Sequence, residues 1–172
     1  MLAAALCCAM TCMVFTACSS DSDDKSEDAN PFVAALMDYQ FTVSTDMLNT
    51  FNFTIEYYDE NSTLQKEQLT QTEWKKNVRA KLPAKLGARL KAQLKSGVVT
   101  EGVRFDITYG YSYMGYAVTA NDLTGIVVSG EENISEGLPG SNVNGWLKDF
   151  GDPLVSYLYT FDAKGTPAQA SW

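Results

Sequence analysis

The sequence predicts an all-β fold: a two-layer antiparallel β-sandwich, immunoglobulin-like, with room for one short helix. Apolar and polar residues alternate with a period of two in several stretches. Clusters of Asp, Asn, Gly and Ser separate these stretches, as turns separate short strands. Strands do not alternate regularly with long helices, which argues against a parallel sheet. These observations favour roughly six or more short strands in one domain, residues 31–172.

The first half of this domain contains a predicted hairpin. Residues 32–39 are apolar except for Asp38 and fit either a helical turn or a first strand. Apolar residues then alternate with Asn, Thr and Glu from Phe51 to Tyr57, which predicts a half-buried strand. The turn cluster at 59–62 allows residues 63–70 to return antiparallel.

Residues 74–95 fit either two strands or one helix. Every second residue is apolar on both sides of Pro83, which predicts two strands joined there, with Lys76 as the single misfit. The residue types favour a helix, because Ala, Leu, Lys, Arg and Gln are good helix formers. Two strands place all these apolar residues inward, whereas a helix scatters the alanines. We therefore expect a strand hairpin.

The second half contains the clearest predicted strand, at 103–113, and a further strand at 155–161. Both are rich in aromatic and β-branched residues, which suit a half-buried pleated surface. Between them, residues 120–153 are rich in Gly, Asn, Asp and Ser and are expected to form loops. A short strand at 126–128 and a helical turn at 146–150 are the regular elements expected there.

The first eighteen residues are typical of an export signal. Residues 2–15 are almost wholly apolar, and as a helix they would span about 21 Å, too short for a bilayer core of about 30 Å. This length suits the hydrophobic region of a signal peptide, assigned here to residues 1–17. No Lys or Arg precedes it, so we expect the natural start to lie upstream. Residues 18–30 are expected to be a flexible acidic tether, because they contain no large apolar side chain.

The four residues Phe15-Thr16-Ala17-Cys18 resemble a bacterial lipobox, whose cysteine is lipidated and becomes the new N-terminus. The acidic run after Cys18 extends the resemblance to small Bacteroidetes-type surface lipoproteins of unassigned function. The resemblance covers residues 15–28 and implies a lipid anchor in the outer membrane, with the domain at the cell surface. It implies no ligand.

The composition argues against several classes of function. A net charge of −8 argues against nucleic-acid binding. The chain has no His, and its four cysteines all precede residue 19, so 31–172 lacks the usual general base, disulfides and Cys/His metal ligands. Two acidic pairs, Glu131 with Glu132 and Asp149 with Asp152, lie in Gly-containing loops, where acids are ordinarily solvated. We therefore predict no enzymatic activity, no metal and no cofactor.

One candidate binding surface is basic. Most Lys and Arg residues of the domain lie between positions 75 and 95, with no acid among them. On a hairpin most would project from one face, where Arg89, Lys91 and Lys95 would bind an anionic glycan or an acidic partner. The alternative is a solvated face whose charges discourage edge-to-edge strand pairing.

The other candidate surface is aromatic. Tyr58, Tyr116, Trp146 and Trp172 do not all fit the positions predicted to face inward. An exposed ring can stack on the flat face of a sugar while its polar tip forms hydrogen bonds. Tyr58, Tyr116 and Trp146 are therefore candidate binding residues, and the alternative is that these rings cover the ends of the core.

These features together predict a lipid-anchored, non-catalytic binding module at the cell surface. Its expected partners are the membrane, through Cys18, and an extracellular glycan or surface protein. The alternative function is that of a structural or adhesive accessory subunit of a surface assembly.

Overall fold

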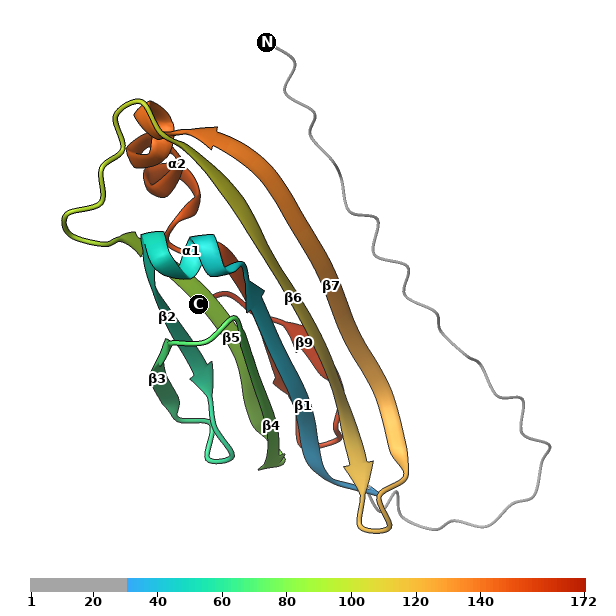
Figure 1. Ribbon diagram of the computed structural model, residues 1–172. Helices are drawn as coiled ribbons and strands as arrows, with labels where there is room; N and C mark the ends of the chain where they lie inside the picture. Colours follow the sequence, from blue (N-terminus) through green and yellow to red (C-terminus); the bar gives the residue numbers. More distant parts are fainter. Residues whose placement is uncertain (1–30) are drawn as a thin grey trace, which may run out of the picture.

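The computed structural model describes residues 31–172. The predicted signal peptide, Cys18 and the acidic tether lie outside the described residues. Within these residues, nine strands form two antiparallel sheets packed against each other, and two short α-helices lie at one end (Figure 1). The predicted all-β class and the two-layer sandwich are confirmed.

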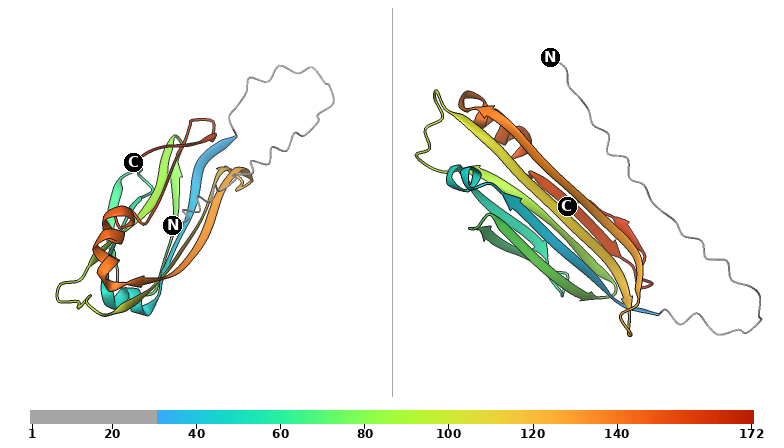
Figure 2. Two further views of the ribbon diagram at one scale, coloured as in Figure 1. Left: turned by 90° about the horizontal axis from the view of Figure 1, so that it is seen from above. Right: turned by 45° about the vertical axis from the view of Figure 1, so that its right-hand side comes forward.

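Sheet A has the strand order β4-β1-β6-β7, and sheet B the order β3-β2-β5-β8-β9. Seen from above, β1 (blue) and β7 (orange) lie in one layer and β5 (green) in the other (Figure 2). The strands of sheet A are β1 (Phe32–Val43), β4 (Glu73–Lys81), β6 (Arg104–Thr119) and β7 (Thr124–Pro139). Those of sheet B are β2 (Phe51–Tyr58), β3 (Leu64–Leu69), β5 (Ala84–Leu94), β8 (Val155–Phe161) and β9 (Pro167–Gln169). The helices are α1 (Thr45–Thr50), η1 (Gly140–Asn142) and α2 (Val143–Phe150).

The strand order differs from that of an immunoglobulin domain. That domain pairs its first two strands with each other, in sheets of order ABED and CFG. Here β1 lies between β4 and β6, and β2 lies in the other sheet. The molecule is therefore an antiparallel sandwich whose connectivity is not the immunoglobulin one.

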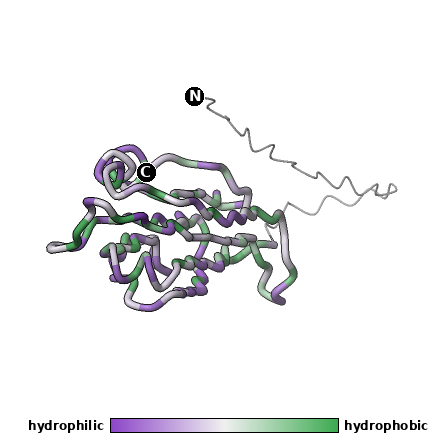
Figure 3. The backbone as a smooth tube through the Cα atoms, turned by 45° about the horizontal axis from the view of Figure 1, so that its top comes forward, coloured by the Kyte–Doolittle hydropathy of each residue, from purple (hydrophilic) through white to green (hydrophobic). Residues whose placement is uncertain are grey.

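The core lies between the inward faces of the two sheets. The predicted inward face of β2 is confirmed, because Phe51, Phe53, Ile55 and Tyr57 are all buried. The same alternation buries every second residue of β1, so 32–39 is part of a strand and not a helical turn. Figure 3 shows hydrophilic and hydrophobic residues alternating along the strands.

Residues 74–95 form two strands, as their alternation predicts, and not a helix. Ala88 and Leu90 are fully buried, with 0% exposed surface. The expected hairpin is wrong, however. β4 pairs with β1 in sheet A, whereas β5 pairs with β2 and β8 in sheet B. The chain passes from one sheet to the other at Leu82 and Pro83. Proline has no backbone N–H, so Pro83 has no main-chain donor that needs a partner at this crossing.

The interval 120–153 is more regular than its composition predicts. β7 extends over Thr124–Pro139 and pairs with β6 along most of this length. Its glycines allow close packing: a Cβ at Gly130 would lie 2.6 Å from the Tyr113 ring. The helical turn expected at 146–150 is the end of α2.

The helix α1 has no counterpart among the predicted elements. Its N-cap is Ser44, whose Oγ accepts a hydrogen bond from the Met47 backbone N–H at 3.2 Å. No helix in the described part of the chain is long and apolar enough to cross a membrane.

Candidate functional site

The structure distributes the candidate binding residues over several places. Tyr58, Arg89 and Lys91 lie on the outer face of sheet B, because their neighbours along β2 and β5 point into the core. Lys95 follows β5. Tyr116 lies on the outer face of sheet A, and Trp146 lies in α2.

The predicted basic face does not exist as one surface. The bases of β4, such as Lys75 and Arg79, point outward from sheet A, whereas Arg89 and Lys91 point outward from sheet B. The alternation along the chain is as expected. Because β4 and β5 lie in opposite layers, however, their outward side chains face in opposite directions.

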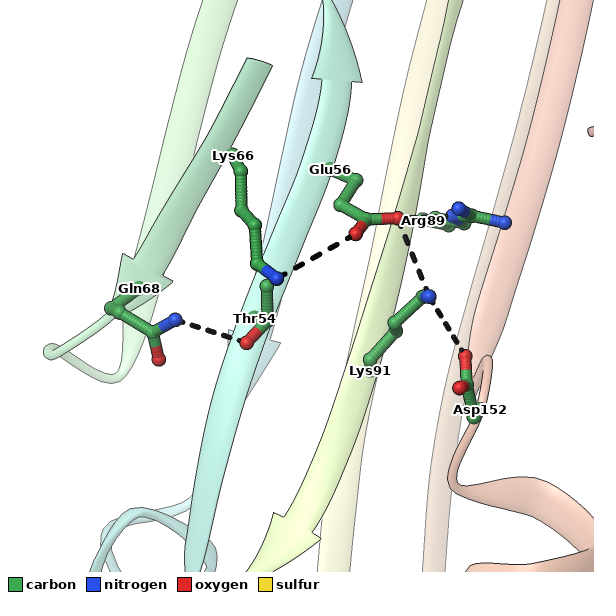
Figure 4. Close-up of polar contacts among 7 residues, drawn as sticks. All are labelled: Thr54, Glu56, Lys66, Gln68, Arg89, Lys91 and Asp152. Carbon is green, nitrogen blue, oxygen red and sulfur yellow. Dashed lines mark hydrogen bonds and ion pairs between the residues drawn. The ribbon is translucent and has the colours of Figure 1, made fainter. Parts of the chain in front are cut away.

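Glu56 is the centre of a charge cluster on the outer face of sheet B (Figure 4). This side chain on β2 is only 11% exposed. Its Oε2 accepts a hydrogen bond from Arg89 Nε at 2.6 Å and lies 3.4 Å from Lys91 Nζ. Lys91 Nζ also lies 3.1 Å from Asp152 Oδ1, which joins β5 to the loop before β8. On the other side, Lys66 Nζ lies 4.0 Å from Glu56 Oε1.

This cluster combines two carboxylates, Glu56 and Asp152, with three cations, Lys66, Arg89 and Lys91. Burial by itself would raise the Glu56 pKa, but the hydrogen bond from Arg89 and the positive charges of Arg89 and Lys91 more than offset it and lower the pKa. Glu56 therefore stays ionised and pairs with the cations around it. Lys95 donates a hydrogen bond to the carbonyl oxygen of Leu48 at the end of α1. The expected anion-binding role of Arg89, Lys91 and Lys95 is not supported by these contacts.

The chain itself covers the aromatic part of this face. The Trp172 ring lies 5.3 Å from the Tyr58 ring, between centroids, and the Arg89 guanidinium lies 4.4 Å from the Trp172 ring centroid. Leu158 occupies an outward-facing position of β8, yet only 1% of its surface is exposed. It pairs with Gly87, and its carbonyl accepts a hydrogen bond from Ala170 N–H beside it in the sheet. The last residues then cross the outer face of sheet B, because Trp172 reaches Arg89 on β5 and Tyr58 on β2. Tyr58 therefore contacts the protein's own tail.

Trp146 belongs to the core and is 8% exposed. Its ring lies 5.9 Å from that of Phe51, and its Nε1–H donates a hydrogen bond to Glu136 at 2.9 Å. Trp146 therefore matches the alternative expectation, in which these rings cover the ends of the core. The amphipathic pattern of α2 places it on the inward side of the helix.

A polar cluster on Glu67 closes the side of the sandwich where β3 and β4 meet. The Glu67 carboxylate accepts hydrogen bonds from Tyr57 Oη at 2.6 Å, Trp74 Nε1 at 2.7 Å and Lys76 Nζ at 2.9 Å. Burial opposes ionisation, but these donors and the Lys76 charge lower the Glu67 pKa to about 2. Lys76, the misfit in the alternation of β4, thus has an inward acidic partner.

The outer face of sheet A carries a groove with a volume of about 710 Å³. Its outward side chains come from all four strands and lie in two neighbouring cross-strand rows. One row consists of Lys75, Gln40, Ser112 and Glu131. The other consists of Asn77, Asp38, Met114 and Ser129. We call this surface the sheet A groove.

Amides and hydroxyls in the sheet A groove are held in place by a chain of hydrogen bonds. Gln40 Nε2 donates to Glu73 Oε1 at 2.9 Å, and its Oε1 accepts from Ser112 Oγ at 3.3 Å. Asn77 donates from its side-chain amide to Asp38. The groove thus offers both donors and acceptors, with Met114 exposed to 49% among them.

Tyr116 is the one candidate binding residue beside this groove. It lies in the next cross-strand row, between Leu36 on β1 and Val127 on β7. Val127 is 52% exposed, so this row adds apolar surface to one end of the polar groove.

Sequence reasoning missed the rest of the groove, although a signal existed. Asp38, Gln40 and Thr42 alternate with apolar residues and mark one outward face. Their polar neighbours in space come from strands far away in the sequence, and pairing of that kind is not visible in a single chain.

Within residues 31–172, no group of three or more His, Cys, Asp or Glu side chains is arranged to hold a metal ion. Comparisons with protein-family models, with curated proteins and with solved structures found no match for this chain.

Proposed function

We propose that this protein is a non-catalytic binding module that holds a glycan in the sheet A groove. The observation that carries the proposal is the composition of this groove, in which polar side chains from four adjacent strands surround a volume of about 710 Å³. A volume of this size lies within the range of small-molecule sites. The groove is partly open to solvent, which suits a segment of a longer polymer.

The chemistry of the groove favours a sugar over an anion or an apolar molecule. Sugar hydroxyls both donate and accept hydrogen bonds, and Gln40, Asn77 and Ser112 offer both kinds of group. The groove lining contains two acids, Asp38 and Glu131, and two bases, Lys75 and Lys76, so it has no excess of positive charge to attract an anionic ligand. The ring of Tyr116 and the thioether of Met114 supply the apolar surface on which the C–H face of a sugar ring packs.

We further propose that a lipid on Cys18 anchors this module to the outer membrane. The support comes from the sequence Phe15-Thr16-Ala17-Cys18 and from the polar, acidic segment that follows it. Several acyl chains on one cysteine are expected to hold the protein firmly, whereas a single chain binds weakly. A Cys18→Ser variant expressed in the native host should shift from the membrane fraction to the soluble fraction. Equal retention of both proteins would rule out the anchor.

The groove is tested by removing its amides. The full-length protein is screened against soluble neutral polysaccharides and an acidic one, such as pectin, by affinity electrophoresis and calorimetry. The double variant Gln40→Ala/Asn77→Ala should bind at least about tenfold more weakly, a loss of about 1.4 kcal/mol. Its unfolding free energy should stay within about 0.5 kcal/mol of the parent value, because both side chains lie on the surface.

The matched control changes the same residue type on the opposite face. Gln68→Ala/Gln93→Ala removes two amides from the outer face of sheet B, where Gln68 is bonded to Thr54. This variant should retain the parent affinity. Equal weakening by both double variants, or binding of the acidic polysaccharide alone, would contradict a neutral glycan in the sheet A groove.

A further inference from the structure

The two edges of sheet A differ in charge. β7 forms one edge, and within the described residues it pairs with β6 alone. From Thr124 to Pro139 it contains three glutamates and no base. β4 forms the other edge, pairs with β1 alone in the described part of the chain, and is predominantly basic. The charged residues of the β7 edge are Glu131, Glu132 and Glu136. Those of the β4 edge are Glu73, Lys75, Lys76, Arg79 and Lys81.

We propose that these edges join head to tail, with β7 of one molecule pairing with β4 of a second copy. An unpaired strand edge presents main-chain donors and acceptors that another strand can satisfy. Charges on an edge normally prevent this. Here β4 against β4 and β7 against β7 are opposed by like charges, whereas β4 against β7 brings opposite charges together.

The strand directions permit this union without turning the second copy over. β4, β1, β6 and β7 are antiparallel to their neighbours in turn, so β7 runs opposite to β4. Two copies in the same orientation therefore continue the antiparallel alternation of sheet A from one molecule into the next.

Side-chain directions also match across the proposed junction. Opposing Glu131 with Lys81, which both point outward, places Glu136 opposite Lys76 and Ile134 opposite Val78. In both molecules, the residues of these last two pairs occupy positions that face inward, toward the core. Two opposite-charge pairs and one apolar pair thus coincide in a single register.

Charged residues of both edges already have partners within one molecule: Lys76 donates to Glu67, and Glu136 accepts from Trp146 Nε1. The pairs of Lys75 and Arg79 are the exposed, exchangeable ones. Lys75 Nζ lies 2.9 Å from Glu73, and Arg79 lies 2.8 Å from Asp122, in pairs whose side chains are 47–72% exposed. Exposed ion pairs contribute little to stability, so a second copy can replace them at small cost. Because a head-to-tail contact uses different surfaces on the two copies, it builds an open row or a ring. This goes beyond the proposed function and does not depend on the groove binding any ligand.

Charge reversal on one edge at a time tests the proposal. Full-length protein is studied by sedimentation velocity over a range of concentrations, at low salt and at about 1 M salt, where the Debye length is about 3 Å. The parent should associate at low salt and dissociate at high salt. Glu131→Lys/Glu132→Lys and Lys75→Glu/Lys81→Glu should each self-associate at least about tenfold more weakly.

The decisive experiment mixes the two charge-reversed proteins in equal amounts. In each variant the two edges have net charges of the same sign. In the mixture, a β7 with net positive charge meets a β4 with net negative charge, and the unchanged basic β4 meets the unchanged acidic β7. Association should therefore return in the mixture. The control Lys148→Glu/Lys164→Glu changes the net charge by the same amount as Lys75→Glu/Lys81→Glu. Its changes lie away from both edges, so it should associate like the parent.

Three outcomes would overturn the proposal: a parent that stays monomeric at low salt, association that both reversed variants retain, or a mixture that stays monomeric. Circular dichroism and thermal melting establish that each variant is folded. Should a reversal unfold the protein, the neutral changes Glu131→Gln/Glu132→Gln and Lys75→Gln/Lys81→Gln test the same edges, and each should weaken association.

Discussion

On the outer face of sheet B, charged and aromatic side chains contact one another, whereas on the outer face of sheet A polar side chains line an open groove. Glu56 binds Arg89 and Lys91, and Trp172 lies between Tyr58 and Arg89. In the sheet A groove, short hydrogen bonds orient the amides but leave them accessible. Residue types that suit binding therefore occur on both faces, and only the contacts distinguish a closed surface from an open one.

The largest expected effect compares one arginine from each face. Arg89→Ala should lower the unfolding free energy by about 2–3 kcal/mol, because Glu56 loses its shortest charged hydrogen bond and stays largely buried. Arg79→Ala removes an exposed ion pair with Asp122 and should change the unfolding free energy by less than about 0.5 kcal/mol. Urea unfolding of both variants measures the difference. Similar values for the two would show that the faces are energetically alike.

A second comparison removes one ring from each face. Trp172→Ala should cost about 2 kcal/mol, because the ring contacts both Tyr58 and Arg89. Tyr116→Ala, beside the open groove, should cost about 1 kcal/mol or less. Thermal melts of the two variants test this order. A less stable Tyr116 variant would mean that the sheet A ring is the structural one.

The smallest expected effect concerns Glu67, at the side of the sandwich where β3 and β4 meet, and it depends on pH. The Glu67 pKa falls from an ordinary value of 4.5 to about 2 on folding, so the folded state favours the ionised form. The contribution of ionised Glu67 to the stability of the folded protein is complete above about pH 4.5 and is lost as the pH falls through about 2. Because the side chain is 37% exposed, solvent screening keeps this contribution small.

Glu67→Gln should therefore flatten the fall in stability between about pH 4.5 and 2. Urea unfolding at a series of pH values measures this slope for the variant and its parent. An unchanged slope would show that Glu67 titrates normally in the folded protein.

The sequence predicted local structure well and pairing poorly. Alternation alone identified β2, β5 and β8 and their inward faces, because strand periodicity is a local property of the chain. It also predicted two strands around Pro83. It did not place β4 and β5 in different sheets, because a connection of two residues fits either a hairpin or a crossing between layers. Of β7, the predicted strand at 126–128 is confirmed but its extension to Pro139 was not predicted, because main-chain pairing with β6 on an edge strand tolerates Gly, Asn and Glu.

The candidate site was predicted less completely than the fold. Residue type identified Arg89, Lys91 and Tyr58, but Glu56 and Trp172 reach them only in three dimensions. Tyr116 was selected as a ring outside the inward pattern and lies beside the sheet A groove. The groove itself combines β1 and β7, which lie far apart in the sequence, so no spacing in the chain marks it.

The position of β1 has a consequence for folding kinetics. β1 is the first strand of the domain, and Phe41 pairs with Trp74 on one side and Tyr111 on the other. Both pairings close long loops, whose entropy is lost before the contacts form. Sheet A therefore cannot grow from the N-terminus by successive hairpins, and we expect β2–β3 and β6–β7 to pair before β1 joins them. Chains dominated by such distant pairings fold in milliseconds to seconds, and stopped-flow refolding should place this domain in that range.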